Sequence, residues 1–135
     1  MRKELEQKLC QDFPDMFAGK DRPLTENLMA FGCECEDGWF QLIYDFCVKA
    51  KGSGLLFTQI KEKFGGLRLY HDFSNWTPDC TIPYEDVEKW AEKAEHKSLF
   101  VCEICGKNAV LCHRGSWLKT LCPVCMEKEK YEVCE

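Results

Sequence analysis

The sequence predicts an α+β fold, in which a small antiparallel sheet packs with about three helices and a C-terminal four-cysteine zinc ribbon follows. Residues 55–73 alternate between apolar and polar side chains around a Gly-Gly pair, which is the pattern of a β-hairpin. The C-terminal part carries two CxxC pairs. Apolar residues recur at helical spacing in three segments, namely 2–12, 39–49 and 82–97. We therefore expect an α+β domain with a central hairpin over 1–100 and a zinc-ribbon subdomain over 101–135.

Each expected helix has its own pattern. In the first, Leu5, Leu9 and Phe13 recur every four residues, which places them on one face. Asp37 is the expected N-cap of the second helix, whose wide apolar stripe should pack on the sheet. Thr81 is the expected cap of the third helix, which carries acidic residues early and lysines late, as the helix dipole favours.

The hairpin register follows from the choice of loop. If the glycines at 65–66 form a two-residue loop, Lys63 lies opposite Arg68 and Lys61 lies opposite Tyr70. These four side chains then share one face of the hairpin, and a longer loop would change their pairing. The opposite, apolar face is expected to carry Ile60, Phe64, Leu67, Leu69 and Phe73.

Cys102, Cys105, Cys122 and Cys125 form two CxxC pairs with sixteen residues between them. This spacing is typical of a structural zinc site, because each CxxC turn points two sulfurs at one place. Four thiolates would fill a tetrahedral shell, so we expect zinc to support folding rather than catalysis. Two disulfides or a redox-active CxxC are the alternatives, and Cys112 with its neighbour His113 could compete as ligands.

The remainder of the C-terminal segment is expected to carry the cysteine pairs. Short strands over 109–112 and 117–121 would form a hairpin, and a last helix is expected over 126–134.

Charge and cysteine usage limit the function classes. The 135 residues carry a net charge of −5, which argues against broad non-specific DNA binding. Within the chain, only residues 55–73 form a segment with a local excess of positive charge. The eleven cysteines, the charged N-terminal residues and the absence of a long apolar run predict a cytoplasmic protein with reduced thiols.

The cationic face of the hairpin is the candidate ligand site. Arginine offers a bidentate fork for phosphate, lysine a point charge, and tyrosine a ring on which a base can stack. Glycines would let the backbone approach a phosphate closely. The simpler interpretation is a solvated charged face with an ordinary turn, which is the commoner case. The candidate ligand-binding residues are Lys61, Lys63, Gly65, Gly66, Arg68, Tyr70 and Trp76.

No set of catalytic residues is recognisable, so we expect a protein that is not an enzyme. His71 alternates onto the apolar side of the hairpin and should be a hydrogen-bonded core histidine. Cys33 and Cys35 are too few for a second metal site, so free core thiols are expected there. Most of the tryptophans should be buried, while Trp76, in a polar loop, could border a ligand pocket.

Three stretches together resemble a family of small, mostly uncharacterised zinc-binding proteins encoded by tailed phages and prophages. They are residues 35–43 (CEDGWFQLI), residues 61–70 (KEKFGGLRLY) and the ribbon residues 102–106 (CEICG) with 117–122 (WLKTLC). Members of that family often have histidine where this chain has Cys125, and phenylalanine where it has Leu69.

The resemblance implies a phage accessory protein in the bacterial cytoplasm, and some phage proteins of this kind counter host defence by binding nucleotide signals. Combined with the cationic hairpin, this predicts a non-enzymatic protein that sequesters an anionic nucleotide-like ligand. The alternative is a zinc-stabilised adaptor that binds a host defence protein or nucleic acid, the latter disfavoured by the net charge. A metal-assisted nuclease is a third, weaker hypothesis. Homo-oligomerisation stays open, and no membrane partner is expected.

Overall fold

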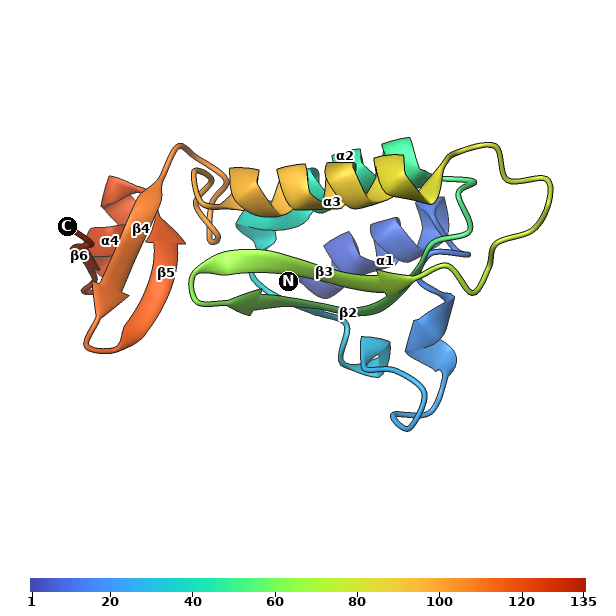
Figure 1. Cartoon of the computed structure of the whole chain (residues 1–135). Helices are drawn as coiled ribbons and strands as arrows, with labels where there is room; N and C mark the ends of the chain where they lie inside the picture. Colours follow the sequence, from blue (N-terminus) through green and yellow to red (C-terminus); the bar gives the residue numbers. More distant parts are fainter.

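A β-hairpin lies at the centre of this computed structural model, which describes residues 1–135. Its strands are β2 (Leu56–Lys63) and β3 (Gly66–Asp72), and the helices α2 (Phe40–Ala50) and α3 (Tyr84–Ser98) lie over one face of it (Figure 1). The ribbon lies beyond the turn of the hairpin, and the loop between β3 and α3 lies at the opposite end (Figure 1).

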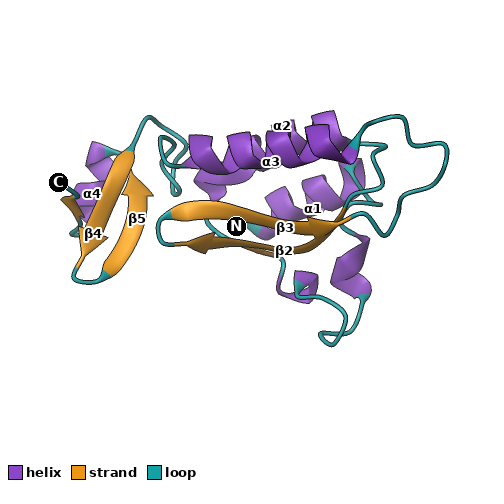
Figure 2. Cartoon of the chain, viewed as in Figure 1, coloured by secondary structure: helices purple, strands orange, loops and turns teal.

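Figure 2 shows all elements by type, with helices in purple and strands in orange. Those not yet named are, in chain order, α1 (Lys3–Asp12), η1 (Ala18–Asp21), η2 (Met29–Phe31), β1 (Cys33–Glu34), η3 (Asp37–Trp39), β4 (Val110–Arg114), β5 (Trp117–Leu121), α4 (Pro123–Lys128) and β6 (Glu132–Val133).

Two small three-stranded sheets confirm the predicted α+β class. In the first, β2 lies between β1 and β3, and in the second, β4 lies between β5 and β6. Strands β2 and β3 are antiparallel, whereas β1 runs parallel to β2 and pairs Cys33 with Ile60. The parallel pairing arises because α2 carries the chain from the end of β1 back to the start of β2.

The predicted loop of the hairpin was wrong by one residue. The turn consists of Phe64 and Gly65, which both have positive φ angles (+53° and +84°), as a type I′ turn requires. Gly66 is instead the first residue of β3 and pairs with Lys63. The pairing therefore moves by two positions, so that Lys61 faces Arg68.

A shift of two positions leaves every strand residue on its predicted face, because side chains alternate with a period of two. Ile60 pairs with Leu69 on the buried face. Phe64 is the exception among the predicted apolar residues, because it lies in the turn and is exposed.

Helix α3 covers the free edge of β3. The backbone N–H of Leu67 donates to the Ser98 hydroxyl (2.9 Å), and that of Leu69 donates to the Glu95 carboxylate (2.8 Å). Two donors that an edge strand would leave unpaired are thus satisfied by side chains of one helix. This arrangement protects the hairpin from pairing with another chain at that edge.

The helices begin at different residues from those expected. Helix α3 starts at Tyr84, and Thr81 does not cap it. Ile82 precedes a proline, which disfavours helical geometry at that residue, and Pro83 itself is extended (ψ 137°). Asp37 lies within η3 and binds Arg2 through a 2.9 Å ion pair instead of capping α2.

The expected last helix over 126–134 was also wrong. Helix α4 ends at Lys128, and Lys130 has a φ angle of +59°, which reverses the chain. The residues that follow form β6, which pairs with β4 and closes the ribbon.

Buried apolar side chains form two separate clusters. The larger, of 20 buried residues, lies between the helices and the hairpin, and all its members precede residue 92. The smaller cluster has seven buried residues, all in the ribbon, and includes Cys112, Leu121 and Tyr131. None of the helices is long and apolar enough to cross a membrane.

Candidate metal centre and cationic hairpin face

The four predicted ligands converge on one point in the ribbon. Cys102 and Cys105 lie in the turn before β4, Cys122 precedes α4, and Cys125 lies within it. Their sulfur atoms all lie within 4.8 Å of one another, and the Sγ atoms of Cys105 and Cys122 are 3.5 Å apart. A tetrahedral metal with bonds of about 2.3 Å would hold sulfurs roughly 3.8 Å apart, so the geometry fits a metal ion. None of the eleven cysteines forms a disulfide.

Local backbone features create this convergence. Gly106 has a φ angle of +82° and donates its N–H to the Cys102 carbonyl (2.9 Å), which closes the first CxxC turn. In the second turn, the backbone N–H of Cys125 donates to the Cys122 sulfur (3.5 Å). Pro123 occupies the first position of α4, where its missing N–H leaves no intrahelical bond unmade.

The thiols have unequal acidity. The hydrogen bond from the Cys125 backbone N–H lowers the pKa of Cys122 to about 6, which favours its thiolate form. Burial raises the pKa of Cys125 to about 12 and also raises that of Cys105. A metal cation is what would allow the remaining thiols to ionise together, as ligation requires. Cys112 stays outside the cluster, with its thiol 3.3 Å from the Val110 carbonyl.

The first ribbon turn docks on the stretch 35–43. The indole N–H of Trp39 donates to the Val101 carbonyl (2.8 Å), and the backbone N–H of Gly38 donates to the Glu103 carbonyl (2.7 Å). A Cβ atom at Gly38 would lie 2.0 Å from the Cys102 carbonyl oxygen, so only glycine fits there.

Glu103 is a buried carboxylate between the two parts of the chain. Only 2% of its surface is exposed, and burial raises its pKa. It accepts hydrogen bonds from the Glu36 backbone N–H (3.2 Å) and from Lys119 (3.4 Å). The Thr120 hydroxyl donates to the carbonyl of Gly65 in the hairpin turn (2.7 Å). Through this hydrogen bond, the ribbon that carries the metal centre supports the hairpin turn.

The cations on the cationic face of the hairpin form no ion pair. Lys61 lies directly opposite Arg68, and neither of them nor Lys63 forms a salt bridge within 4.0 Å. The acidic neighbours in sequence are used elsewhere: Glu62 accepts the Gly65 backbone N–H (2.7 Å), and Asp72 accepts from Ser74. Like charges in directly opposed positions are unfavourable. The nearest carboxylate on this face is that of Glu34, which pairs with Lys61 from β1 and accepts a hydrogen bond from Gln59 Nε2 (3.2 Å) rather than forming an ion pair.

Of the other predicted ligand residues, Tyr70 and Gly66 lie beside the cations, whereas Trp76 lies far from them. Tyr70 lies on the cationic face with its ring 5.9 Å from the Lys61 ammonium, and the position of a Cβ on Gly66 is 3.1 Å from the Arg68 guanidinium. Both glycines are buried, and Leu111 and Leu118 of the ribbon lie over Gly65. Trp76 is 56% exposed but lines a different cavity of about 460 Å³, in the loop at the far end of the hairpin.

Two exposed aromatic residues were missed. Phe64 was expected on the apolar face and Trp117 among the core aromatics, yet they are 69% and 71% exposed. Both line a groove of about 310 Å³ between the hairpin turn and the turn of the ribbon. The usable signal for Trp117 was its position directly after the Gly115-Ser116 turn, where a strand has few neighbours to cover it.

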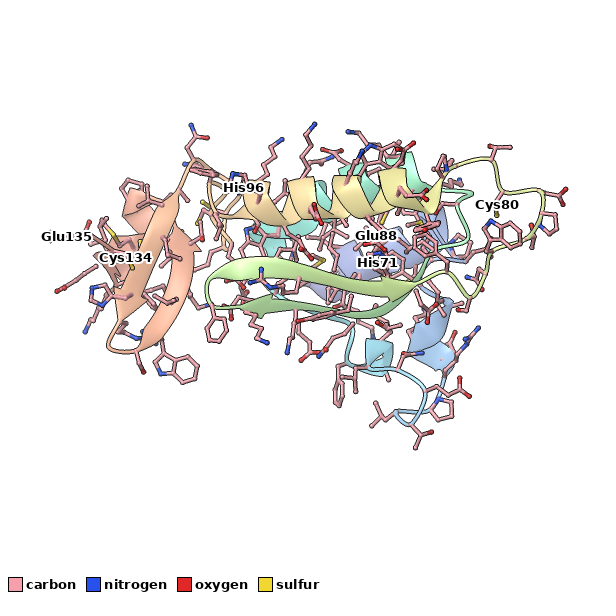
Figure 3. The ribbon with its side chains drawn as sticks, in the orientation of Figure 1. His71, Cys80, Glu88, His96, Cys134 and Glu135 are labelled. Carbon is pink, nitrogen blue, oxygen red and sulfur yellow. The ribbon has the colours of Figure 1, made fainter.

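The other residues noted in the sequence are structural. His71 faces Glu88 across β3 and α3, with their side chains 3.1 Å apart, and its Nδ1 lies 2.7 Å from the Leu69 carbonyl (Figure 3). This confirms the hydrogen-bonded core histidine. Cys33 and Cys35 are buried and outside any metal cluster, and burial raises the pKa of Cys35 to about 12.

The site thus consists of a four-cysteine metal centre, a hairpin whose cationic face forms no ion pair, and an aromatic groove beside that face. Comparison of the chain with protein-family models, with curated proteins and with solved structures found no match.

Proposed function

We propose that this protein is a non-enzymatic, zinc-stabilised binder of a small anionic, nucleotide-like ligand. The observation that carries the proposal is the direct opposition of Lys61 and Arg68, with Lys63 on the same face. None of these three cations forms an ion pair, and Glu34, beside Lys61 on β1, is a single carboxylate against three positive charges. A bound phosphate would relieve the repulsion between these cations and would gain charge-assisted hydrogen bonds. Three cations in an otherwise acidic chain suit a small ligand better than a long polynucleotide.

Zinc is the metal proposed for the four-cysteine cluster. Four thiolates at tetrahedral distances are a typical structural zinc set, and they leave no open position for a substrate. The metal would contribute to folding, and its role at the ligand site would be indirect, through the Thr120 contact to the turn.

The biological role extends this proposal through the resemblance to phage proteins. A cytoplasmic protein that sequesters a nucleotide-like signal would lower its free concentration and so counter a host defence that depends on it. An enzyme is not required for this effect, because a binder in excess over the signal is sufficient.

A second candidate function is an adaptor that binds a host protein through the aromatic groove. The exposure of both Phe64 and Trp117 favours this alternative, since aromatic residues are enriched at protein interfaces. Binding by apolar contacts would persist at high salt, whereas binding to the cationic face would weaken.

The substitution Lys61→Glu tests the proposed function. It places a carboxylate between Arg68 on β3 and Glu34 on β1, so the new attraction and the new repulsion should roughly offset each other while the positive charge of the site is reduced. We expect calorimetry to show that wild-type protein binds tripolyphosphate and ATP, and that this variant binds neither, although its melting temperature stays close to that of wild type.

The double variant Lys3→Glu, Arg22→Glu is the matched control, because it reverses one lysine and one arginine that are exposed and unpaired elsewhere. It should bind both anions like wild type. Equal loss of binding in the control would attribute the effect to net charge and would contradict the assignment of the site.

A further inference from the structure

The groove beside the cationic face has aromatic residues on both sides. It lies between the hairpin turn and the β4–β5 turn, and its volume is about 310 Å³. Phe64 comes from the first turn, and Trp117 follows the second. Its lining residues are Glu62, Lys63, Phe64, Ser116, Trp117 and Leu118.

Phe64 is a poor choice for stability at its position. Its φ angle of +53° lies in the left-handed region, where a bulky side chain is unfavourable and where type I′ turns strongly prefer asparagine followed by glycine. Its ring is also 69% exposed and therefore contributes little hydrophobic stabilisation. A residue that is unfavourable both in backbone conformation and in exposure is a candidate for a binding role.

The groove is continuous with the cationic face. Lys63 belongs to both, because it lines the groove and its ammonium lies 5.6 Å from the centre of the Phe64 ring. Lys61 lies two residues earlier on the same face of β2. A ligand with an anionic part and a flat aromatic part could therefore contact the cations and the two aromatic rings together.

We propose that this groove holds the base of the bound nucleotide, stacked against Phe64 and Trp117, while its phosphates contact Lys61, Lys63 and Arg68. This inference rests on the proposed function, since it assumes that the cationic face binds phosphate. Stacking on aromatic side chains tolerates different bases, because every base has a π-face. The ribbon, which contributes Trp117 and Ser116, is then part of the ligand site as well as its support.

The test compares two probes, ATP and tripolyphosphate, by calorimetry on the wild-type protein at the same ionic strength. Tripolyphosphate has the phosphates without the base. We expect ATP to bind roughly 5- to 150-fold more tightly, as stacking on one or two rings predicts. In Trp117→Ala, affinity for ATP should fall to the tripolyphosphate level, while affinity for tripolyphosphate stays unchanged.

Phe64→Asn separates binding from folding. Asparagine suits the turn, so this variant should melt at a higher temperature than wild type and yet lose the preference for ATP. Trp76→Ala is the matched control, because it removes an exposed tryptophan that lines a different cavity, and it should retain the preference.

The outcomes separate this inference from the proposed function. If ATP and tripolyphosphate bind wild type equally, and neither groove variant changes this, the base site is wrong while the phosphate site stands. If neither probe binds, both proposals are wrong. If Phe64→Asn lowers the melting temperature and keeps the preference for ATP, Phe64 has a structural role and the inference is overturned.

Discussion

At the scale of single residues, the charged groups divide into those that are paired and those that are not. Glu103 is buried and His71 is partly buried, and each has defined partners. Buried polar groups require such partners, because desolvation without a hydrogen bond costs about 1–3 kcal/mol. The chain leaves no buried side-chain nitrogen or oxygen without a partner. The absence of ion pairs at Lys61, Lys63 and Arg68 is therefore a local property of the hairpin face.

Asp12 gives a pH-dependent prediction at this scale. The Tyr44 hydroxyl (2.6 Å) and the Lys8 ammonium (3.1 Å) donate to its carboxylate and hold its pKa below the usual value. A carboxyl group whose pKa is lowered by folding stabilises the protein above its unfolded pKa, and this contribution is lost as the pH falls. Tyr44→Phe should raise the pKa of Asp12, as followed by NMR titration of wild type and variant under the same conditions. An unaltered titration of Asp12 would show that the hydrogen bond is absent in solution.

At the scale of elements, the contact between the stretch 35–43 and the ribbon depends on one glycine. Gly38→Ala would place a methyl group 2.0 Å from the Cys102 carbonyl oxygen, and backbone atoms on both sides would have to move. We expect this variant to lose more than about 2 kcal/mol of unfolding free energy in urea. Gly52→Ala is the control: it has open space but a φ angle of +84°, so it should lose only about 1 kcal/mol. Equal losses would show that the ribbon does not dock tightly at Gly38.

The elements also show what the sequence could and could not predict. Helices α1, α2 and α3 were predicted because their apolar spacing follows the helical period. The hairpin was found but its register was shifted, since a Gly-Gly pair hides which glycine occupies the turn. The faces remained correct because the shift was even. The exposure of Phe64 was not predictable, because an aromatic residue usually indicates a core and the turn position of Phe64 depended on the register. For Trp117, the position after the Gly115-Ser116 turn was the one available signal.

At the scale of the whole molecule, the ribbon has its own small core and is connected to the hairpin by few contacts. The four cysteines were predicted from local spacing alone, because both pairs lie in tight turns. The position of the ribbon relative to the hairpin comes from the structure, in which the Thr120 hydroxyl donates to the Gly65 carbonyl (2.7 Å). The ribbon and the hairpin turn should therefore lose their order together.

Removal of the metal tests this dependence. In Cys122→Ser, the cluster loses its most acidic thiol, so we expect the bound zinc, about one per chain by mass spectrometry, to be lost. Tripolyphosphate binding should weaken as the turn loses its support. Cys134→Ser is the control, because Cys134 lies outside the cluster, and it should keep both metal and ligand. Full zinc content in Cys122→Ser would contradict the four-cysteine site.

The central claim, that the hairpin face binds an anion, is tested most directly by an NMR titration of the ¹⁵N-labelled protein with tripolyphosphate. The account predicts that the largest amide shifts cluster on Lys61, Lys63, Gly66 and Arg68. Another lysine-rich groove, between α2 and α3, provides the internal comparison, since Lys49, Lys93 and Lys97 surround it. Shifts that cluster in that groove, or no saturable shifts at all, would contradict the account.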